Sequence, residues 1–151
     1  EAAGLARYEI SNFARPGRAS RHNLKYWRCE TVLGAGVGAH WFDGTRRRFN
    51  TSGFEAYLKE AGKPGGAETD ESRGASPADV AQERVLLGLR LVEGVDLGAL
   101  EHEHPGITTR MAPVLQRHAG TGLIVMEGTR ARLSLRGVLL SNEVLQDVLA
   151  A

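Results

Sequence analysis

The chain has 151 residues, of which 42% are hydrophobic and 25% are charged, and its formal net charge is +1. This composition is that of an ordinary globular protein, long enough to bury a sizeable core. A net charge so close to zero gives no overall basic field that would favour nucleic acid or an anionic membrane as a partner. The single cysteine, Cys29, excludes an intramolecular disulfide framework and a metal cluster held by this chain alone, and it suits a reducing compartment.

Membrane and targeting signals are absent from the sequence pattern. No apolar run approaches the roughly 20 residues that a membrane-spanning helix needs, and residues 1–10 do not resemble a secretory signal. We therefore expect a cytoplasmic protein without a transmembrane segment. The sequence does not exclude peripheral contact with a membrane. Because the sequence has no initiator Met and enters a strand pattern within a few residues, we expect a piece of a longer chain.

The first 62 residues predict strands, a loop and one helix. Residues 5–10 predict a short strand, which the turn signal Arg15-Pro16-Gly17 ends. Residues 18–31 show no sustained period and predict a loop, whereas residues 32–40 are apolar and glycine-interrupted and predict a buried strand. Residues 54–61 carry apolar side chains at helical spacing and predict a helix.

The remaining chain predicts a linker followed by a mainly helical domain. Residues 63–75, KPGGAETDESRGA, are rich in glycine and charge and predict the linker. Ser76 and Pro77 are typical of a helix start. We expect helices at 77–91, after Asp96, at 107–118 and at 136–150, and a hairpin of residues 123–126 and 132–135. The last helix should bury an apolar stripe of Leu139, Leu140, Val144, Leu145 and Val148. This order predicts a winged-helix-like domain.

The sequence HNLKYW places His22, Asn23, Tyr26 and Trp27 within six residues. Imidazole can ligate iron, and aromatic rings offer flat apolar faces, so the group could hold a porphyrin. The alternative is that Tyr26 and Trp27 anchor a loop while His22 satisfies a backbone group. From the residues alone, this structural alternative is favoured.

Three other features allow a structural or a functional interpretation. The alternate glycines of GAGVGAH, at 34, 36 and 38, would leave one strand face bare, either for packing or for a ligand. Glu83 and Arg90 lie seven apart on one face of the helix at 77–91 and predict a buried or interface ion pair to other elements. His102, His104 and His118 lack the spacing of a zinc site.

Five sequence blocks together resemble a known family. They are, in order, YEISNFARPG, SRHNLKYW, LGAGVGAH, ERVLLGLRLVEGVDL and LSLRGVLLSNEV. They resemble the C-terminal part of the radical-SAM family of oxygen-independent coproporphyrinogen III oxidase-like proteins. The resemblance implies an α/β fold. Residues 1–62 would be the C-terminal portion of an incomplete TIM-type radical-SAM barrel, residues 63–75 a linker and residues 76–151 the winged-helix-like HemN-type C-terminal domain.

The same resemblance implies cofactors, partners and site residues. Ser11, Phe13, Gly38 and Ala39 match positions that line the S-adenosylmethionine site in the family. The HNxxYW motif is characteristic of the family's haem-chaperone branch and is intact as His22, Asn23, Tyr26 and Trp27. It implies a haem site formed by these four residues, with His22 as the iron ligand or a haem-orienting group and with Tyr26 and Trp27 packing the macrocycle. It also implies acceptor haemoproteins as partners. The resemblance thus reverses the preference for a purely structural His22.

One departure from the family limits what this chain can do. The family's Cys-x3-Cys-x2-Cys motif, which ligates a 4Fe-4S cluster, is absent, and we expect it in a preceding half. The 151 residues alone should not cleave S-adenosylmethionine, and no catalytic residue is assigned.

Two other functions are alternatives to a haem chaperone. The first is an oxygen-independent coproporphyrinogen III oxidase, a dehydrogenase of porphyrin biosynthesis in which Arg15, Arg18 or Arg21 would pair with substrate propionates. The second is a winged-helix DNA-binding module in residues 76–151. The near-neutral charge and the barrel-like first half disfavour this module, so no nucleic-acid partner is expected.

Overall fold

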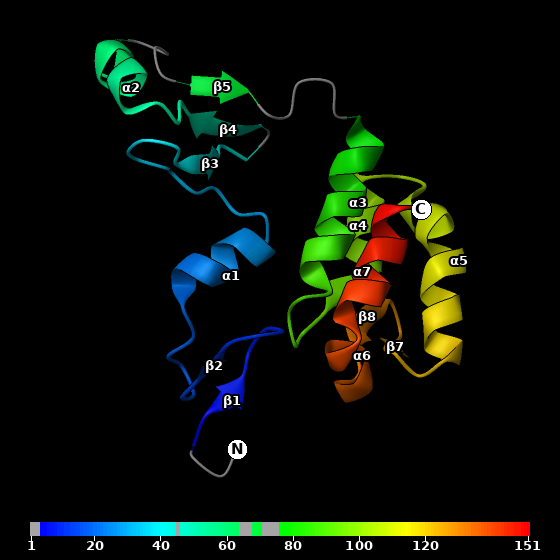
Figure 1. Cartoon of the computed structure of the whole chain (residues 1–151). Helices are drawn as coiled ribbons and strands as arrows, with labels where there is room; N and C mark the ends of the chain where they lie inside the picture. The colour runs from blue at the N-terminus through cyan, green and yellow to red at the C-terminus, as the bar shows by residue number, and fades with distance from the viewer. Residues whose placement is uncertain (1–3, 45, 64–67, 71–75) are drawn as a thin grey trace. The chain divides into compact units, whose positions relative to one another are not determined.

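The computed structural model describes residues 4–44, 46–63, 68–70 and 76–151, with only the backbone of residues 68–70. The fold is mixed α/β (Figure 1). Contacts divide the chain into two units. The first combines Glu1–Arg28 with Ser76–Ala151, and the second is Cys29–Ala75. The predicted division into residues 1–62, 63–75 and 76–151, and the assignment of a barrel and a winged helix, stay predictions.

The core of the first unit lies among three helices. They are α3 (Pro77–Gly88), α5 (Ile107–Gly120) and α7 (Ser141–Leu149), which contact one another in pairs (Figure 1). Each contributes apolar residues three or four positions apart, the spacing that places side chains on one helix face. The fully or nearly buried residues of these stripes are Ala81, Val85 and Leu89 from α3 and its cap, Ile107, Met111, Val114 and Leu115 from α5, and Val144, Leu145 and Val148 from α7.

A small antiparallel sheet and a short helix complete this core. The sheet has the order β6-β8-β7, formed by β6 (Val95–Asp96), β7 (Ile124–Glu127) and β8 (Arg130–Leu133). The hairpin predicted at 123–135 is confirmed. The helix after Asp96 is also confirmed, as α4 (Leu97–Glu103). Gly94, just before β6, has φ +71°, and a Cβ there would lie 2.2 Å from the carbonyl oxygen of Ala131, so only glycine fits this approach.

The single helix predicted at 136–150 is wrong, because the chain forms two helices there. They are α6 (Leu135–Leu139) and α7, and they are separated at Leu140, whose φ and ψ are −107° and 24°. The hydroxyl of Ser134 accepts from the Gly137 amide, so the helix start lies one residue earlier than predicted. Leu139 is 85% exposed and Leu140 is 40% exposed, so the apolar stripe covers only Val144, Leu145 and Val148.

The N-terminal residues contain a hairpin and a helix that the sequence pattern did not predict. Within the predicted strand at 5–10, only β1 (Ala6–Arg7) is regular, and it pairs with β2 (Phe13–Ala14). The loop predicted at 18–31 is wrong, because Arg21–Trp27 forms helix α1. The hydroxyl of Ser20 caps it by accepting from the Asn23 amide at 3.3 Å. This cap was the available signal for the helix.

The second unit contains a three-stranded antiparallel sheet and a helix. The sheet has the order β3-β4-β5, formed by β3 (His40–Phe42), β4 (Arg47–Asn50) and β5 (Glu68–Asp70), and the helix is α2 (Phe54–Glu60). The helix predicted at 54–61 is confirmed. Strand β5 lies inside the predicted linker, residues 63–75, most of which falls outside the described residues.

The buried strand predicted at 32–40 is wrong. Val32 forms an isolated bridge with Phe42, but regular strand structure begins only at His40. Between them the chain turns, with φ +102° at Gly36 and +64° at Gly38. Positive φ suits glycine in a turn and interrupts a strand. The alternate glycines therefore shape a loop and do not bare one face of a strand.

Candidate functional site

The four residues of the HNxxYW motif lie on two faces of helix α1. Residues four apart are neighbours on a helix surface, so His22 lies beside Tyr26, and Asn23 lies beside Trp27. The rings of His22 and Tyr26 are in T-shaped contact, with centroids 5.0 Å apart. His22 is exposed and Tyr26 is half-buried. We call this pair the outer face of α1, and Asn23 with Trp27 its inner face.

The inner face of α1 is attached to other parts of the first unit. Asn23 donates from Nδ2 to the hydroxyl of Tyr8 at 3.3 Å. The guanidinium of Arg90 lies over the indole of Trp27, 4.4 Å from the ring centroid. Cation–π contacts of this kind contribute about 0.5–2 kcal/mol. The ion pair predicted for Arg90 is therefore replaced, among the contacts of the described residues, by a stack on an aromatic ring.

The strand before α1 meets the turn after α3. The Tyr8 carbonyl accepts from the Val92 amide at 3.2 Å, and Glu9 forms an antiparallel bridge with Leu91. The side chain of Glu9 is fully buried, and its Oε1 accepts from the Ser11 amide at 2.9 Å. Its Oε2 has no hydrogen-bond partner among the described residues. Pattern reasoning missed this carboxyl because glutamate in a short strand ordinarily faces water.

His22 offers an imidazole nitrogen that could ligate haem iron. Its imidazole is exposed, and no hydrogen bond to it is found within the described part of the chain. Neutral imidazole ligates haem iron in many proteins, and an adjoining aromatic ring offers an apolar edge for the macrocycle. The donor chemistry of the outer face therefore fits haem.

The four predicted S-adenosylmethionine contacts lie in different units. Ser11 and Phe13, both exposed, belong to the first unit, and Gly38 and Ala39 belong to the second. The Gly38 amide donates to the Thr51 carbonyl at 3.1 Å, and the Ala39 carbonyl accepts from the Asn50 amide at 2.9 Å. These bonds hold the glycine loop against the end of β4. The role of the four residues in binding the cofactor stays a prediction.

The residues of this chain do not fit a 4Fe-4S cluster. Such a cluster needs several thiolates, and Cys29 is the only cysteine. Among the described residues, no group of three or more His, Cys, Asp and Glu side chains is arranged to hold a metal ion. No cluster ligand is therefore assigned to these 151 residues.

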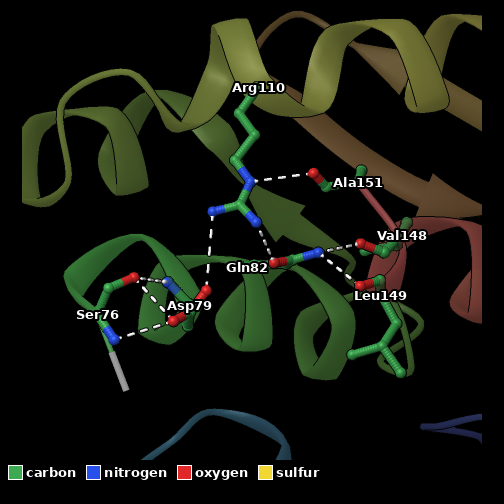
Figure 2. Close-up of polar contacts among 7 residues, drawn as sticks. All are labelled: Ser76, Asp79, Gln82, Arg110, Val148, Leu149 and Ala151. Atoms are coloured by element: carbon green, nitrogen blue, oxygen red, sulfur yellow. Dashed lines mark hydrogen bonds and ion pairs between the residues drawn. The ribbon is translucent and has the colours of Figure 1, made fainter. Parts of the chain in front are cut away.

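A cavity of about 430 Å³ lies in the first unit, between the start of α3 and the loop leading into α5. Its lining residues include none of those predicted for S-adenosylmethionine or haem. Arg110 lies at its edge, and Figure 2 shows where this cation is directed. Its Nη2 donates to Gln82 Oε1 at 2.7 Å, its Nε donates to the Ala151 carbonyl at 3.3 Å, and its Nη1 lies 4.0 Å from Asp79. Arg110 thus joins α5 to α3 and to the end of α7.

The carboxyl groups with lowered pKa values have structural partners. The Ser76 amide and hydroxyl hold the pKa of Asp79 below its ordinary value, and these contacts complete the capping box at the start of α3. Hydrogen bonds from Gly106 and Thr108 lower the pKa of Glu101. Arg84 lowers the pKa of Glu103, and Arg132 lowers that of Glu127. These shifts reflect caps and ion pairs, so they do not indicate a catalytic acid.

The sequence and fold were compared with known proteins. Residues 75–140 match the HemN C-terminal domain family. The haem chaperone HemW of Bacillus subtilis is 34% identical over 95% of this chain and 38% of its own length. HemW of Mycobacterium tuberculosis is 38% identical over 98% of this chain and 36% of its own length.

A solved structure shows the same fold. Coproporphyrinogen III oxidase (HemN) from Escherichia coli, described as a radical SAM enzyme, superposes with a TM-score of 0.71 at 17% identity. The match covers 97% of this chain and 37% of the solved one. The chain thus spans a little over a third of the length of each of these three proteins. No helix in its described part has the length and apolar character needed to cross a membrane. The chain therefore contains a HemN C-terminal domain and is a relative, over nearly its whole length, of the C-terminal part of HemW.

Proposed function

We propose that this chain is the C-terminal part of a radical-SAM haem chaperone, which binds haem and passes it to acceptor haemoproteins. The observation that carries this proposal is the outer face of α1, where an exposed histidine adjoins a tyrosine ring with centroids 5.0 Å apart. Relatives 34% and 38% identical are named haem chaperones, which supports the same function here.

The two faces of α1 have different roles in this proposal. His22 would ligate the iron, and Tyr26 would offer an aromatic contact to the macrocycle. Asn23 and Trp27 hold the helix in place through Tyr8 and Arg90. When bound, haem would supply the iron to which the imidazole nitrogen donates its lone pair. An exposed ligand suits a protein that must release haem, because the acceptor can approach the same side.

The longer protein uses two further cofactors in this proposal. Ser11 and Phe13 of the first unit, and Gly38 and Ala39 of the second, stay candidates for binding S-adenosylmethionine. Residues outside this chain would supply the thiolates of the 4Fe-4S cluster. The winged-helix-like domain covers residues 76–151. We also place the protein in the cytoplasm, because one cysteine suits a reducing compartment.

A haem titration of the complete protein that contains this chain, followed by optical spectra, tests the function. The His22→Ala variant should bind haem about tenfold or more weakly, a difference of about 1.4 kcal/mol, and its Soret band should shift because the iron loses a ligand. The matched control is His102→Ala, since His102 is also an exposed helical histidine. Wild-type chain that does not bind haem, or a His22→Ala spectrum identical to wild type, would contradict the proposal.

The alternative function, an oxygen-independent coproporphyrinogen III oxidase, is not favoured. The solved oxidase is only 17% identical to this chain, so that likeness shows the fold alone. A decarboxylase assay of the longer protein, with S-adenosylmethionine and its 4Fe-4S cluster, separates the two functions. Decarboxylation of coproporphyrinogen III without haem binding would favour the oxidase.

A further inference from the structure

Arg90 connects the HemN C-terminal domain to the helix that carries the HNxxYW motif. Helix α3 ends at Gly88, and Arg90 lies in the turn that follows, with its amide donating to the Leu87 carbonyl at 3.1 Å. Its half-buried side chain places the guanidinium 4.4 Å from the Trp27 ring centroid. A planar cation over an indole is a directional contact, so it fixes the position of the ring as well as its distance.

A second contact holds the end of α1 to the same turn. Arg28, the C-terminal cap of α1, donates from Nε and Nη2 to the two carboxylate oxygens of Glu93, at 3.1 and 3.3 Å. This ion pair is exposed, so solvent and salt weaken it. Arg90 Nε and Trp27 Nε1 are instead buried, and neither has a hydrogen-bond partner within the described residues. The stack is therefore the more protected of the two contacts.

The orientation of α1 depends on these contacts. The helix has seven residues, none of them fully buried, and a helix of this length does not persist in water by itself. Trp27 lies one position after Tyr26 and four after Asn23. A rotation of α1 that moved Trp27 out of the stack would also turn the outer face, with His22, in a new direction.

We propose that Arg90 is a positioning residue for haem. By holding Trp27, it sets the direction in which His22 and Tyr26 of α1 point, and so it couples the HemN C-terminal domain to the haem site. This inference rests on the proposed function of α1. It assigns to residue 90 a role beyond folding of the C-terminal domain.

The test is a haem titration of the complete protein that contains this chain, with three variants in α3 and the turn that follows it. Arg90→Ala should weaken haem binding about fivefold to tenfold and shift the Soret band toward that of His22→Ala. Arg90→Lys should restore much of the affinity, because it keeps a cation beside the indole. Arg84→Ala is the matched control, since Arg84 on α3 pairs with Glu103 and does not stack on Trp27. It should bind haem as wild type does.

The outcomes separate this inference from the proposed function. If Arg90→Ala matches wild type in affinity and spectrum while His22→Ala does not, the positioning role is wrong and the haem function stands. If wild-type chain does not bind haem, both are wrong. If Arg90→Ala fails to fold, Arg90→Lys and Trp27→Phe are combined in a double-mutant cycle on haem affinity. If the fold-changes in haem affinity of the two single variants multiply to give that of the double variant, the inference is overturned. If the double variant departs from that product, the two residues are coupled and the inference is supported.

Discussion

A buried glutamine completes the hydrogen bonds at the C-terminal end of α7. The last carbonyl groups of a helix have no donor within the helix. Gln82, which is 6% exposed, donates from Nε2 to the Val148 carbonyl at 2.6 Å and to the Leu149 carbonyl at 3.0 Å (Figure 2). Its Oε1 accepts from Arg110, whose charge also suits the negative end of the helix dipole. One side chain of α3 thus connects α5 and α7.

Replacing this glutamine should destabilise the first unit. Gln82→Ala leaves both carbonyls and the Arg110 guanidinium without this partner, and we expect the free energy of unfolding to fall by about 1–3 kcal/mol. Urea unfolding followed by circular dichroism measures the change. Gln146→Ala on the exposed side of α7 is the control and should stay within about 0.5 kcal/mol of wild type. Equal losses in both variants would contradict the capping role of Gln82.

At the scale of elements, side-chain caps mark the starts of α3, α4 and α6. Asp96 Oδ1 accepts from the amides of Gly98 and Ala99 at 3.0 and 3.1 Å, at the start of α4. The same oxygen accepts from the Thr129 hydroxyl at 3.0 Å, and Oδ2 accepts from Arg130 at 3.3 Å. Asp96 therefore caps α4 and also attaches it to the β7–β8 turn.

This cap should make stability depend on acid pH. The Ala99 amide, followed by the Thr129 hydroxyl, lowers the pKa of Asp96 from its ordinary value of 3.8. Since the folded pKa lies below the unfolded one, the charged group stabilises the fold above pH 3.8, and this contribution is lost as the pH falls through the folded pKa.

Thermal unfolding at several pH values compares wild type with Asp96→Asn, which keeps a capping side chain but has no charge to titrate. The melting temperature of wild type should exceed that of the variant most above about pH 5. This difference in melting temperature should shrink below pH 3.8. A difference that stays constant with pH would show that the charge of Asp96 does not contribute.

Local signals explain which elements could be predicted from the sequence. Ser76 with Pro77, and Asp96, are caps that act within a few residues, so the starts of the helices after them agree with the prediction. Helix α3 ends at Gly88, three residues before its predicted end at residue 91. Helix α1 was missed because it has no fully buried face, and a short surface helix shows little apolar periodicity. The loop at Gly36 and Gly38 was mistaken for a strand, because composition does not reveal the sign of φ.

At the scale of the whole molecule, the candidate site could be predicted only in part. The motif identified His22, Asn23, Tyr26 and Trp27 as a group, but not which of them face outward. That division depends on the formation of α1 and on its contact with Arg90, which is 63 positions further along the chain than Trp27. Such a contact between distant residues has no local signal in the sequence. For the same reason the buried carboxyl of Glu9 was not predicted.

The division of the HNxxYW motif into two faces is the central claim, and paired measurements on four variants test it most directly. Haem affinity and thermal stability would be measured for His22→Ala, Tyr26→Ala, Asn23→Ala and Trp27→Phe in the full chain. The outer-face variants should lose haem affinity at nearly unchanged melting temperature. The inner-face variants should lower the melting temperature, because Asn23→Ala loses the contact to Tyr8 and Trp27→Phe weakens the stack with Arg90. If His22→Ala and Asn23→Ala changed both quantities to the same extent, the two faces would not have separate roles, and the account would be contradicted.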